Sequence, residues 1–393
     1  MKYNTSLFSQ ILQLIPRTSF ERLVRETKAA RYAKGFSCWT QCVAMLFCQF
    51  AQSKSLREIS DGLRITHGKL NHLRVEAAPS KSTLAYANAH RPAELYERLF
   101  AEMLARCQTV RQGKKKQFRF KNPLYSLDAS TINLCLSLFP WAEFRQTKGA
   151  IKLHLVLDHD GYLPTYALIT EGKRHEVTVA HAFTFPKGSI IVMDRGYCDY
   201  GLFHSWHQAG LFFVTRQKSN ADYQVVCNLT LPARGNVRSD QLIRFLGVKA
   251  QRDCPVVLRR IVVGDERQQR EIVLLTNHLR FSATTIAAIY RDRWEIELFF
   301  KALKQQLKIK TFVGTTENAL KLQIWTALIS LLLLKYLQFT SRCGWPLCRL
   351  VAMLRLNLFT YRNLGEFLND PFQAPPEAPP YQLTLGFQTA STA

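Results

Sequence analysis

Acidic residues are scarce in this chain of 393 residues. Fifty-three lysines and arginines stand against 29 aspartates and glutamates, which leaves a formal net charge of +24 and a pI near 9.8. Such an excess opposes compaction and is typical of proteins that bind a polyanion. The composition favours DNA or RNA as the partner over a membrane surface or a merely solvated basic face. Because 47% of the residues are apolar, wholesale disorder is excluded.

The sequence also lacks any cysteine spacing that predicts a disulfide or zinc framework. Of its ten cysteines, Cys38, Cys42 and Cys48 fall in an apolar helical stretch, where cysteine is usually a small hydrophobic residue. Cys343 and Cys348 form a single C-x4-C without a second pair. We therefore expect reduced thiols in the cytoplasm.

No segment reads as a signal peptide or as a membrane span. Residues 1–20 are polar apart from a short apolar break at 11–15. The strongest apolar run, residues 324–334, ends at Lys335 and is too short to cross a bilayer, so we expect a buried helix there. The expectation is a cytoplasmic protein with no membrane partner.

The basic charge is concentrated near the N-terminus, where residues 1–121 hold 22 Lys and Arg against 8 Asp and Glu. Residues 1–110 read as a helical domain, with helices after Ser55 and Ser80. Two short helices around a turn favour a helix-turn-helix-like unit that contacts DNA, although a plain helical bundle would give the same pattern.

Residues 111–123 form a basic linker. Its densest run is Lys114-Lys115-Lys116, with Phe118 and Phe120 close by. This run is either a solvated linker or a strip that contacts phosphates.

From residue 124 the pattern changes to short apolar runs that predict an α/β sheet with helices on its faces. We expect a catalytic core in two parts, 124–219 and 281–340, separated by an all-β insertion at 220–280 and followed by a C-terminal region, 341–393, with a Pro-rich tail. The predicted strands of the first part are 124–128, 151–158, 162–170, 190–194 and 211–215, with helices at 176–183 and 200–208.

One helical segment, residues 283–307, carries its candidate functional side chains on a single face. Because each helical residue turns roughly 100°, Tyr290, Arg293, Glu297 and Lys304 share one narrow arc, and Lys301 lies close to it. The opposite face, with Phe299, Leu303 and Leu307, is apolar. A single carboxylate among cations suits a site that holds a metal ion and phosphates, and a surface helix with ion pairs is the alternative.

Two further carboxylates complete a candidate site. Asp128 and Asp194 are each predicted to end an apolar strand, and strand ends are where active-site groups gather in α/β sheets. Each alone is as readily a turn residue or helix cap. Together with Glu297 they are suited to bind two Mg²⁺ ions, or Mn²⁺, for phosphoryl transfer.

The segment from Tyr290 to Lys304 matches Y-x2-R-x3-E-x6-K at every fixed position. It resembles the signature of DDE transposases of the fourth family of bacterial insertion sequences. Leu127-Asp128 and Met193-Asp194-Arg195-Gly196-Tyr197 resemble that family's first two acidic motifs, and residues 1–75 resemble an N-terminal domain found in one of its branches.

The resemblance implies a ribonuclease-H-like core with a β insertion before the last acid. It implies that Asp128, Asp194 and Glu297 are metal ligands, and that Tyr290, Arg293 and Lys304 position the DNA backbone at the transposon ends. It further implies nicking, a hairpin intermediate, strand transfer into target DNA, and a homodimer in a synaptic complex on the bacterial nucleoid. From the residues alone, Arg195 is as readily a phosphate contact as a partner of the nearby acids.

Tryptophan is absent from residues 220–280, although characterised members of this family use one there to hold a flipped base. Tyr223 or Phe245 is the candidate replacement. Trp294 and Trp325 are expected in the core. Two alternative functions stay open: a metal-dependent nuclease of the same fold, and an inactive DNA-binding repressor of the element.

Overall fold

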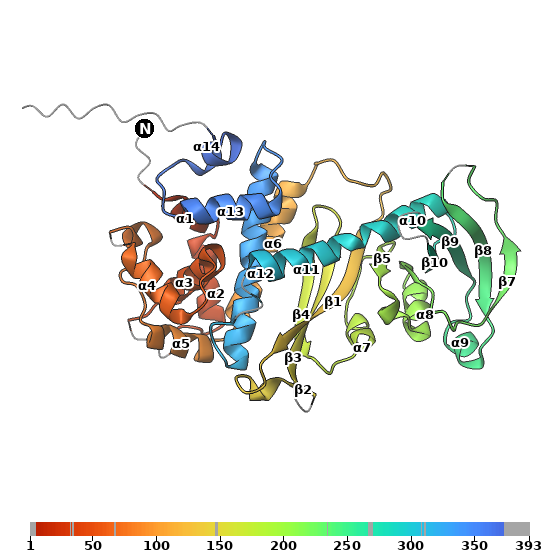
Figure 1. Ribbon diagram of the computed structural model, residues 1–393, viewed down its shortest axis with the longest axis horizontal. Helices are drawn as coiled ribbons and strands as arrows, with labels where there is room; N and C mark the ends of the chain where they lie inside the picture. The colour runs from red at the N-terminus through yellow and green to blue at the C-terminus, as the bar shows by residue number, and fades with distance from the viewer. Residues whose placement is uncertain are drawn as a thin grey trace, which may run out of the picture.

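The structure is a computed structural model of the chain, shown in Figure 1. Helices occupy the N-terminal end, a single large sheet fills the middle, and the sheet extends to the opposite end of an elongated molecule. The residues it describes are 5–31, 33, 35–66, 68–145, 148–233, 235–265, 270–307, 309 and 312–372.

The N-terminal region is helical, as the sequence predicts. Serine side chains cap several of its helices: Ser6, Ser37, Ser55 and Ser80 each accept a hydrogen bond from the backbone N–H three residues later. The helices are α1 (Leu7–Leu12), α2 (Arg17–Glu26), α3 (Cys38–Ala51), α4 (Leu56–Ile65), the 3-10 turn η1 (Leu70–Leu73), α5 (Lys81–His90) and α6 (Glu94–Arg111).

The strands of the described chain form one sheet of order β2-β3-β1-β5-β6-β10-β9-β8-β7, with β4 paired to β3. β1, β5 and β6 are parallel to one another, and the remaining pairs are antiparallel. The strands are β1 (Leu124–Leu134), β2 (Glu143–Arg145), β3 (Lys148–Asp158), β4 (Leu163–Glu171), β5 (Ile190–Met193), β6 (Phe212–Arg216), β7 (Tyr223–Asn228), β8 (Val237–Phe245), β9 (Leu258–Asp265) and β10 (Arg270–Thr276).

Helices cover both faces of the sheet. Ile191 and Met193 of β5 pack with α8 (Tyr200–Gln208), whereas Ile190 and Val192 pack with α10 (Ala283–Asp292). Alternate residues of one buried strand therefore meet different helices, as strand geometry requires. The predicted α/β fold class is confirmed. Shorter elements complete this part: η2 (Pro140–Ala142), α7 (Glu176–Ala180) and η3 (Arg195–Tyr197).

Residues 220–280 continue the central sheet instead of forming a separate one. β10 pairs with β6 from Thr276 to Leu274, and β9, β8 and β7 follow outward (Figure 1). The segment is also not purely β, because α9 (Val248–Asp253) packs next to α8 and carries buried Ala250.

The segment predicted as one helix at 283–307 is two helices, α10 and α11 (Trp294–Gln306), that meet at Arg293. Arg293 keeps right-handed helical angles, φ −52° and ψ −29°, so the side-chain spacing across the junction is largely preserved. Phe299, Leu303 and Leu307 are buried, which confirms the predicted apolar face.

α12 (Glu317–Thr340) runs through the middle of the molecule. Its 24 residues make it longer than predicted, and by length and composition it is the one described helix able to cross a membrane. However, 83% of its most apolar window is buried inside the protein, where it packs against α3, α5 and α6. The prediction of a buried core helix is confirmed.

The last helices return to the start of the chain. α13 (Leu347–Asn357) packs on α3 and α12, and α14 (Leu364–Asn369) lies against α1. The Gln10 side chain donates to the Arg362 carbonyl at 2.7 Å and accepts from the Leu364 N–H at 2.8 Å. The Pro-rich part of the tail lies outside the described residues.

Candidate active site

The first two acids follow neighbouring parallel strands. β1 pairs with β5 up to Leu127 and Met193. Asp128 and Asp194 are the residues that follow these two positions in the chain, so the register brings them to the same edge of the parallel pair. The expectation that Asp128 ends its strand is wrong, because β1 continues to Leu134 by pairing with β3. What ends at Asp128 is the pairing with β5.

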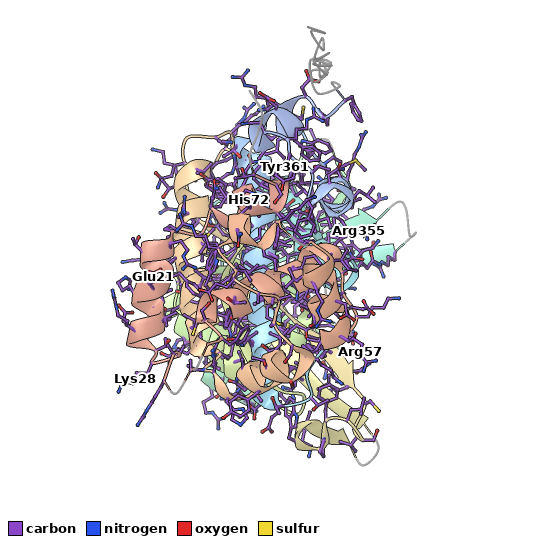
Figure 2. All side chains as sticks on the ribbon, turned by 90° about the vertical axis from the view of Figure 1, so that its left-hand side faces the viewer. Glu21, Lys28, Arg57, His72, Arg355 and Tyr361 are labelled. Carbon is purple, nitrogen blue, oxygen red and sulfur yellow. The ribbon has the colours of Figure 1, made fainter. Side chains whose placement is uncertain are left out.

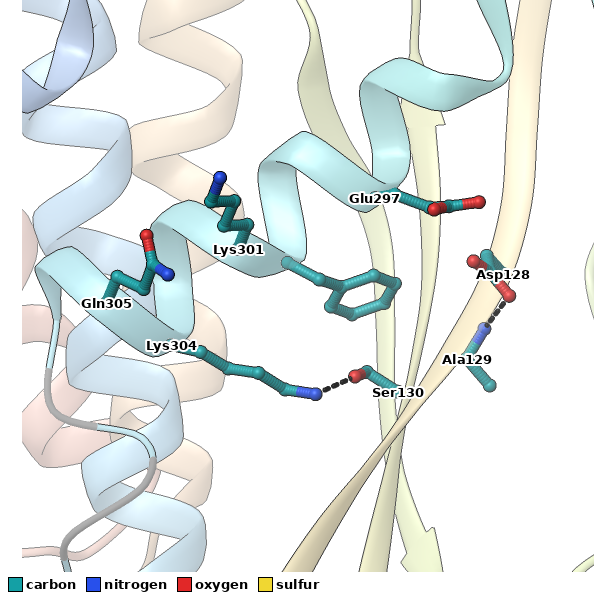
Figure 3. A pocket seen from close by; sticks show the side chains of 8 residues that line it. Asp128, Ala129, Ser130, Glu297, Lys301, Lys304 and Gln305 are labelled. Atoms are coloured by element: carbon teal, nitrogen blue, oxygen red, sulfur yellow. Dashed lines mark hydrogen bonds between the residues drawn. The ribbon is translucent and has the colours of Figure 1, made fainter. Parts of the chain in front are cut away.

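The third acid lies on α11 and faces the first (Figure 3). Glu297 stands in the first turn of α11, and the Arg293 Nη2 atom donates to its Oε1 at 2.7 Å. The Arg293 Nη1 atom is 4.0 Å from Asp128 Oδ2, and the Tyr290 ring lies 5.7 Å from the guanidinium. One arginine therefore links the strand acid to the helix acid.

A cavity of about 320 Å³ opens between β1 and α11. Figure 3 shows Glu297 and Asp128 close together and Lys304 reaching toward Ser130, to which its ammonium donates a hydrogen bond. Acidic and basic side chains thus share one concave surface. The lining residues are Asp128, Ala129, Ser130, Glu297, Phe300, Lys301, Lys304 and Gln305.

The acids influence one another electrostatically. Burial raises the pKa of Asp128 to about 6, and the charges of Asp194 and Glu297 act in the same direction. The Ala129 N–H, 2.8 Å from Asp128 Oδ1, and the Arg293 charge oppose that rise. The three carboxylates therefore lie within electrostatic reach of one another, and Asp128 is the member whose pKa this raises.

A buried hydroxyl stands beside these acids. Tyr197 is 1% exposed, and its hydroxyl has no hydrogen-bond partner among the residues that the structure describes. Burial raises the pKa of Tyr197, and the charges of Asp128, Glu176 and Asp194 raise it further. An unpaired polar atom beside partly buried negative charge fits a site that receives a cation together with its bound water.

The chemistry of the donor set fits a divalent cation, since carboxylate oxygens are the hard ligands that Mg²⁺ and Mn²⁺ prefer. Within the described ranges, however, no three His, Cys, Asp or Glu side chains stand close enough to ligate one ion. The Arg293 guanidinium supplies the positive charge beside Asp128 and Glu297 in this arrangement.

The other basic candidates lie apart from the cavity lining. Arg195 is exposed in η3, directly after Asp194. Lys114 donates to the Phe339 carbonyl, Lys116 lies 3.3 Å from Asp160, and Lys115 is exposed. Among the predicted DNA contacts, Lys301 and Lys304 line the cavity.

Some aromatic residues depart from expectation. Trp294 is 56% exposed, so its predicted place in the core is wrong, whereas Trp325 is 6% exposed and lies in the core as predicted. Phe245 is buried against Tyr200, with ring centroids 4.7 Å apart, and is not accessible for stacking on a base. Tyr223 is half-buried beneath the Arg260 guanidinium.

Sequence reasoning missed two polar residues of the cavity. Ser130 follows Asp128 by two residues and so lies on the same face of β1, and Gln305 follows Glu297 by eight residues on α11. The two-residue spacing of Ser130 repeats the strand period, so the strand pattern was sufficient to find it. Gln305 lies about 80° around the helix from Glu297, outside the arc used to select the site residues, so the helical pattern did not single it out.

Two acids directly after the last paired residues of adjacent parallel strands, with a third acid on a helix over the sheet, are the arrangement of ribonuclease-H-like enzymes that act on nucleic acids. Residues 119–333 match the family model described as transposase DDE domain, and the chain belongs to this family of DNA-cleaving and DNA-transferring enzymes. Residues 3–75 match a domain of unknown function, DUF4372.

Curated relatives agree with this family. The chain is 32% identical to the putative transposase y4zB of Sinorhizobium fredii, over 79% of this chain and 87% of that one. It is 30% identical to the probable transposase for insertion sequence element IS5377 of Geobacillus stearothermophilus, over 65% and 67% of the two chains. It is 24% identical to the putative transposase for element IS4SA of Synechocystis, over 67% and 73%. The resemblance based on residues 290–304 is confirmed at the level of the family.

Proposed function

We propose that this chain binds the terminal inverted repeats of its own insertion sequence, cuts the DNA there and transfers the cut strands into target DNA. The observation that supports this most directly is the cavity between β1 and α11, where Asp128 and Glu297 face each other and Lys304 lies on the same surface. A reacting phosphodiester needs acids that hold divalent cations and cations that hold the neighbouring phosphates.

Asp128, Asp194 and Glu297 would hold two Mg²⁺ ions, with Mn²⁺ as a substitute. When bound, such a pair activates water or a 3′-hydroxyl and stabilises the leaving oxygen. Arg293 would hold Glu297 in the direction of Asp128 until DNA and metal arrive, because it contacts both acids.

The DNA backbone would lie along α11. Lys304 and exposed Lys301 would hold phosphates on the cavity side, and Tyr290 with Arg293 would fix the strand beside the acids. Arg195 would contact the strand next to Asp194.

The N-terminal region would supply the larger part of DNA affinity. Figure 2 shows Lys28, Arg57 and Arg355 on the face that the N-terminal and C-terminal helices share, and all three are exposed. Arg355 donates to Gln52, whereas no ion pair is recorded for Lys28 or Arg57 in the described chain. Exposed cations of this kind contribute salt-dependent affinity for phosphates.

We therefore propose residues 1–110 as the DNA-binding region and 111–123, with Lys114, Lys115 and Lys116, as a basic linker. Residues 124–219 and 281–340 would form the catalytic core, divided by the insertion at 220–280, and residues 341–393 the C-terminal region. Because two transposon ends must be joined, a homodimer would assemble on the DNA, in the bacterial cytoplasm.

A reconstituted reaction tests this proposal. A supercoiled donor plasmid carrying the element's own ends is incubated with the purified chain, with and without Mg²⁺, and with a target plasmid. The proposal expects Mg²⁺-dependent cleavage at the ends and joined products. Cleavage without joining would identify a nuclease of the same fold, and binding without cleavage would identify a repressor.

A further inference from the structure

A chain of three buried polar side chains runs behind the acids. The His159 Nδ1–H donates to the Asp292 carboxylate, which can only accept, and His159 Nε2 lies 2.7 Å from the Ser126 hydroxyl. Ser126 is 0% exposed, His159 6%, and the Asp292 side chain 8%. Burial closes the triad off from substrate, so its serine is not placed to act as a nucleophile.

The three residues of this triad lie on or beside the elements that carry the proposed metal ligands. Ser126 lies on β1, two residues before Asp128, and Asp292 is the last residue of α10, one residue before Arg293. His159 follows β3, and its backbone N–H donates to the Leu124 carbonyl of β1 at 3.0 Å. A single imidazole therefore connects the strand that carries the first acid to the helix junction that precedes the third.

Two more side chains hold Asp292 from the other side. Gln117 donates from Nε2 to Asp292 Oδ1 at 2.8 Å, and the Tyr162 hydroxyl lies 3.3 and 3.4 Å from the two carboxylate oxygens while also contacting Gln117. Both carboxylate oxygens are thus engaged. A group held by this many partners has few alternative positions.

The location of Asp292 is otherwise unfavourable. It occupies the C-terminal end of α10, where the helix dipole opposes a negative charge. Burial of the carboxylate adds a desolvation cost. Hydrogen bonds from His159, Gln117 and Tyr162 offset these costs at the one point where α10 breaks and α11 begins.

We propose that Asp292 and His159 are positioning residues: through Ser126 they fix the α10–α11 junction against β1, so that Glu297 and Arg293 face Asp128. This inference rests on the proposed function, because it assigns these residues to the geometry of the proposed metal site. Groups that orient metal-binding side chains change metal affinity or activity about 10- to 100-fold when they are removed.

The test compares Asp292→Asn and His159→Gln with a matched control, Asp240→Asn. Asp240 is also a buried carboxylate, 3% exposed, and Arg259 donates to it at 2.8 and 2.6 Å in the insertion. Each full-length variant is assembled with end DNA, and Mn²⁺ binding to the complex is titrated by electron paramagnetic resonance. The thermal midpoint, the Kd for end DNA and the Mg²⁺ dependence of nicking are measured in parallel.

We expect Asp292→Asn and His159→Gln to weaken Mn²⁺ binding by about 10- to 100-fold and to raise the Mg²⁺ concentration for half-maximal nicking, with end binding changed less than about threefold. Asp240→Asn should lower the thermal midpoint without moving the Mn²⁺ titration. If either positioning variant binds Mn²⁺ as the wild type does, or if Asp240→Asn shifts the titration equally, the inference is overturned.

Ser126→Ala is a milder substitution that keeps the inference testable if the other variants fail to fold. Ser126→Ala removes one hydroxyl from the triad and leaves the His159–Asp292 contact in place. It should weaken Mn²⁺ binding less than Asp292→Asn but in the same direction, and an unchanged titration would count against the inference. Wild-type protein that neither binds Mn²⁺ nor nicks end DNA would instead refute the proposed function.

Discussion

His154 makes the stability of this protein depend on pH in a way that can be calculated. It lies on β3 opposite Ala129 of β1, is 0% exposed, and its Nε2 lies 2.9 Å from the Thr170 hydroxyl. Burial, together with the charges of Lys152 and Arg174, lowers the pKa of His154 from 6.5 to about 4. The folded protein therefore keeps this imidazole neutral where the unfolded chain protonates it.

The sign follows from which state binds the proton. Well above pH 6.5 neither state is protonated at His154, and the contribution to stability is fully present. As the pH falls from 6.5 toward 4, only the unfolded chain takes up a proton, so the free energy of unfolding decreases. One pKa unit corresponds to about 1.4 kcal/mol, which gives a loss of about 2 kcal/mol at pH 5 and about 3 kcal/mol below pH 4.

Urea unfolding of the metal-free protein at pH 7.5 and pH 5 measures this loss. Wild type should lose about 2 kcal/mol more than His154→Gln between the two pH values. The comparison is a difference of differences, so the packing cost of the substitution and the titration of other groups largely cancel. Equal losses in the two proteins would show that His154 titrates normally in the folded state and would refute the reasoning.

Three further outcomes are expected. Asp194→Ala should abolish Mg²⁺-dependent nicking while it leaves end binding in a gel-shift assay largely intact, and cleavage by this variant would remove Asp194 from the metal site. Lys304→Ala should weaken end binding and lower the slope of log Kd against log salt by about one, so an unchanged slope would argue against a phosphate contact. Leu328→Ala, in the buried middle of α12, should lower the free energy of unfolding by about 2–5 kcal/mol in thermal or urea unfolding. Trp294→Ala, at a side chain that is 56% exposed, should lower it by less than about 1 kcal/mol. Similar losses in the two variants would contradict the difference in burial between the two side chains.

The local sequence pattern predicted β5, which ends directly before Asp194, and the helix α8 that packs on it. The apolar run of β5 ends where Asp194 begins, and α8 spans residues 200–208 as predicted. These elements are short, apolar and bounded by charged residues or glycine, so the local sequence was sufficient to predict where they begin and end.

Other features of the fold depend on contacts between distant segments, which the local sequence does not reveal. The apolar run at 124–128 did not reveal that β1 continues through polar residues to Leu134, because only the partner strand β3 makes that extension favourable. The same reason applies to β8 within the insertion: its polar centre, which has no strand-like apolar pattern, contains Asp240, and this carboxylate becomes buried by pairing with Arg259 of β9. The junction at Arg293 contains neither proline nor glycine, so the local sequence did not predict a break between α10 and α11.

The packing of α1 against α14 determines when, during synthesis, this part of the fold can form. Leu7 and Phe8 bond through their backbone N–H groups to the carbonyls of Thr360 and Leu358, and α1 shares one apolar core with α12, α13 and α14. The core around α1 therefore cannot be completed until α12, α13 and α14 have been synthesised. We expect a chain that lacks either α1 or the helices α12 to α14 to leave this shared core open and to be degraded as misfolded protein.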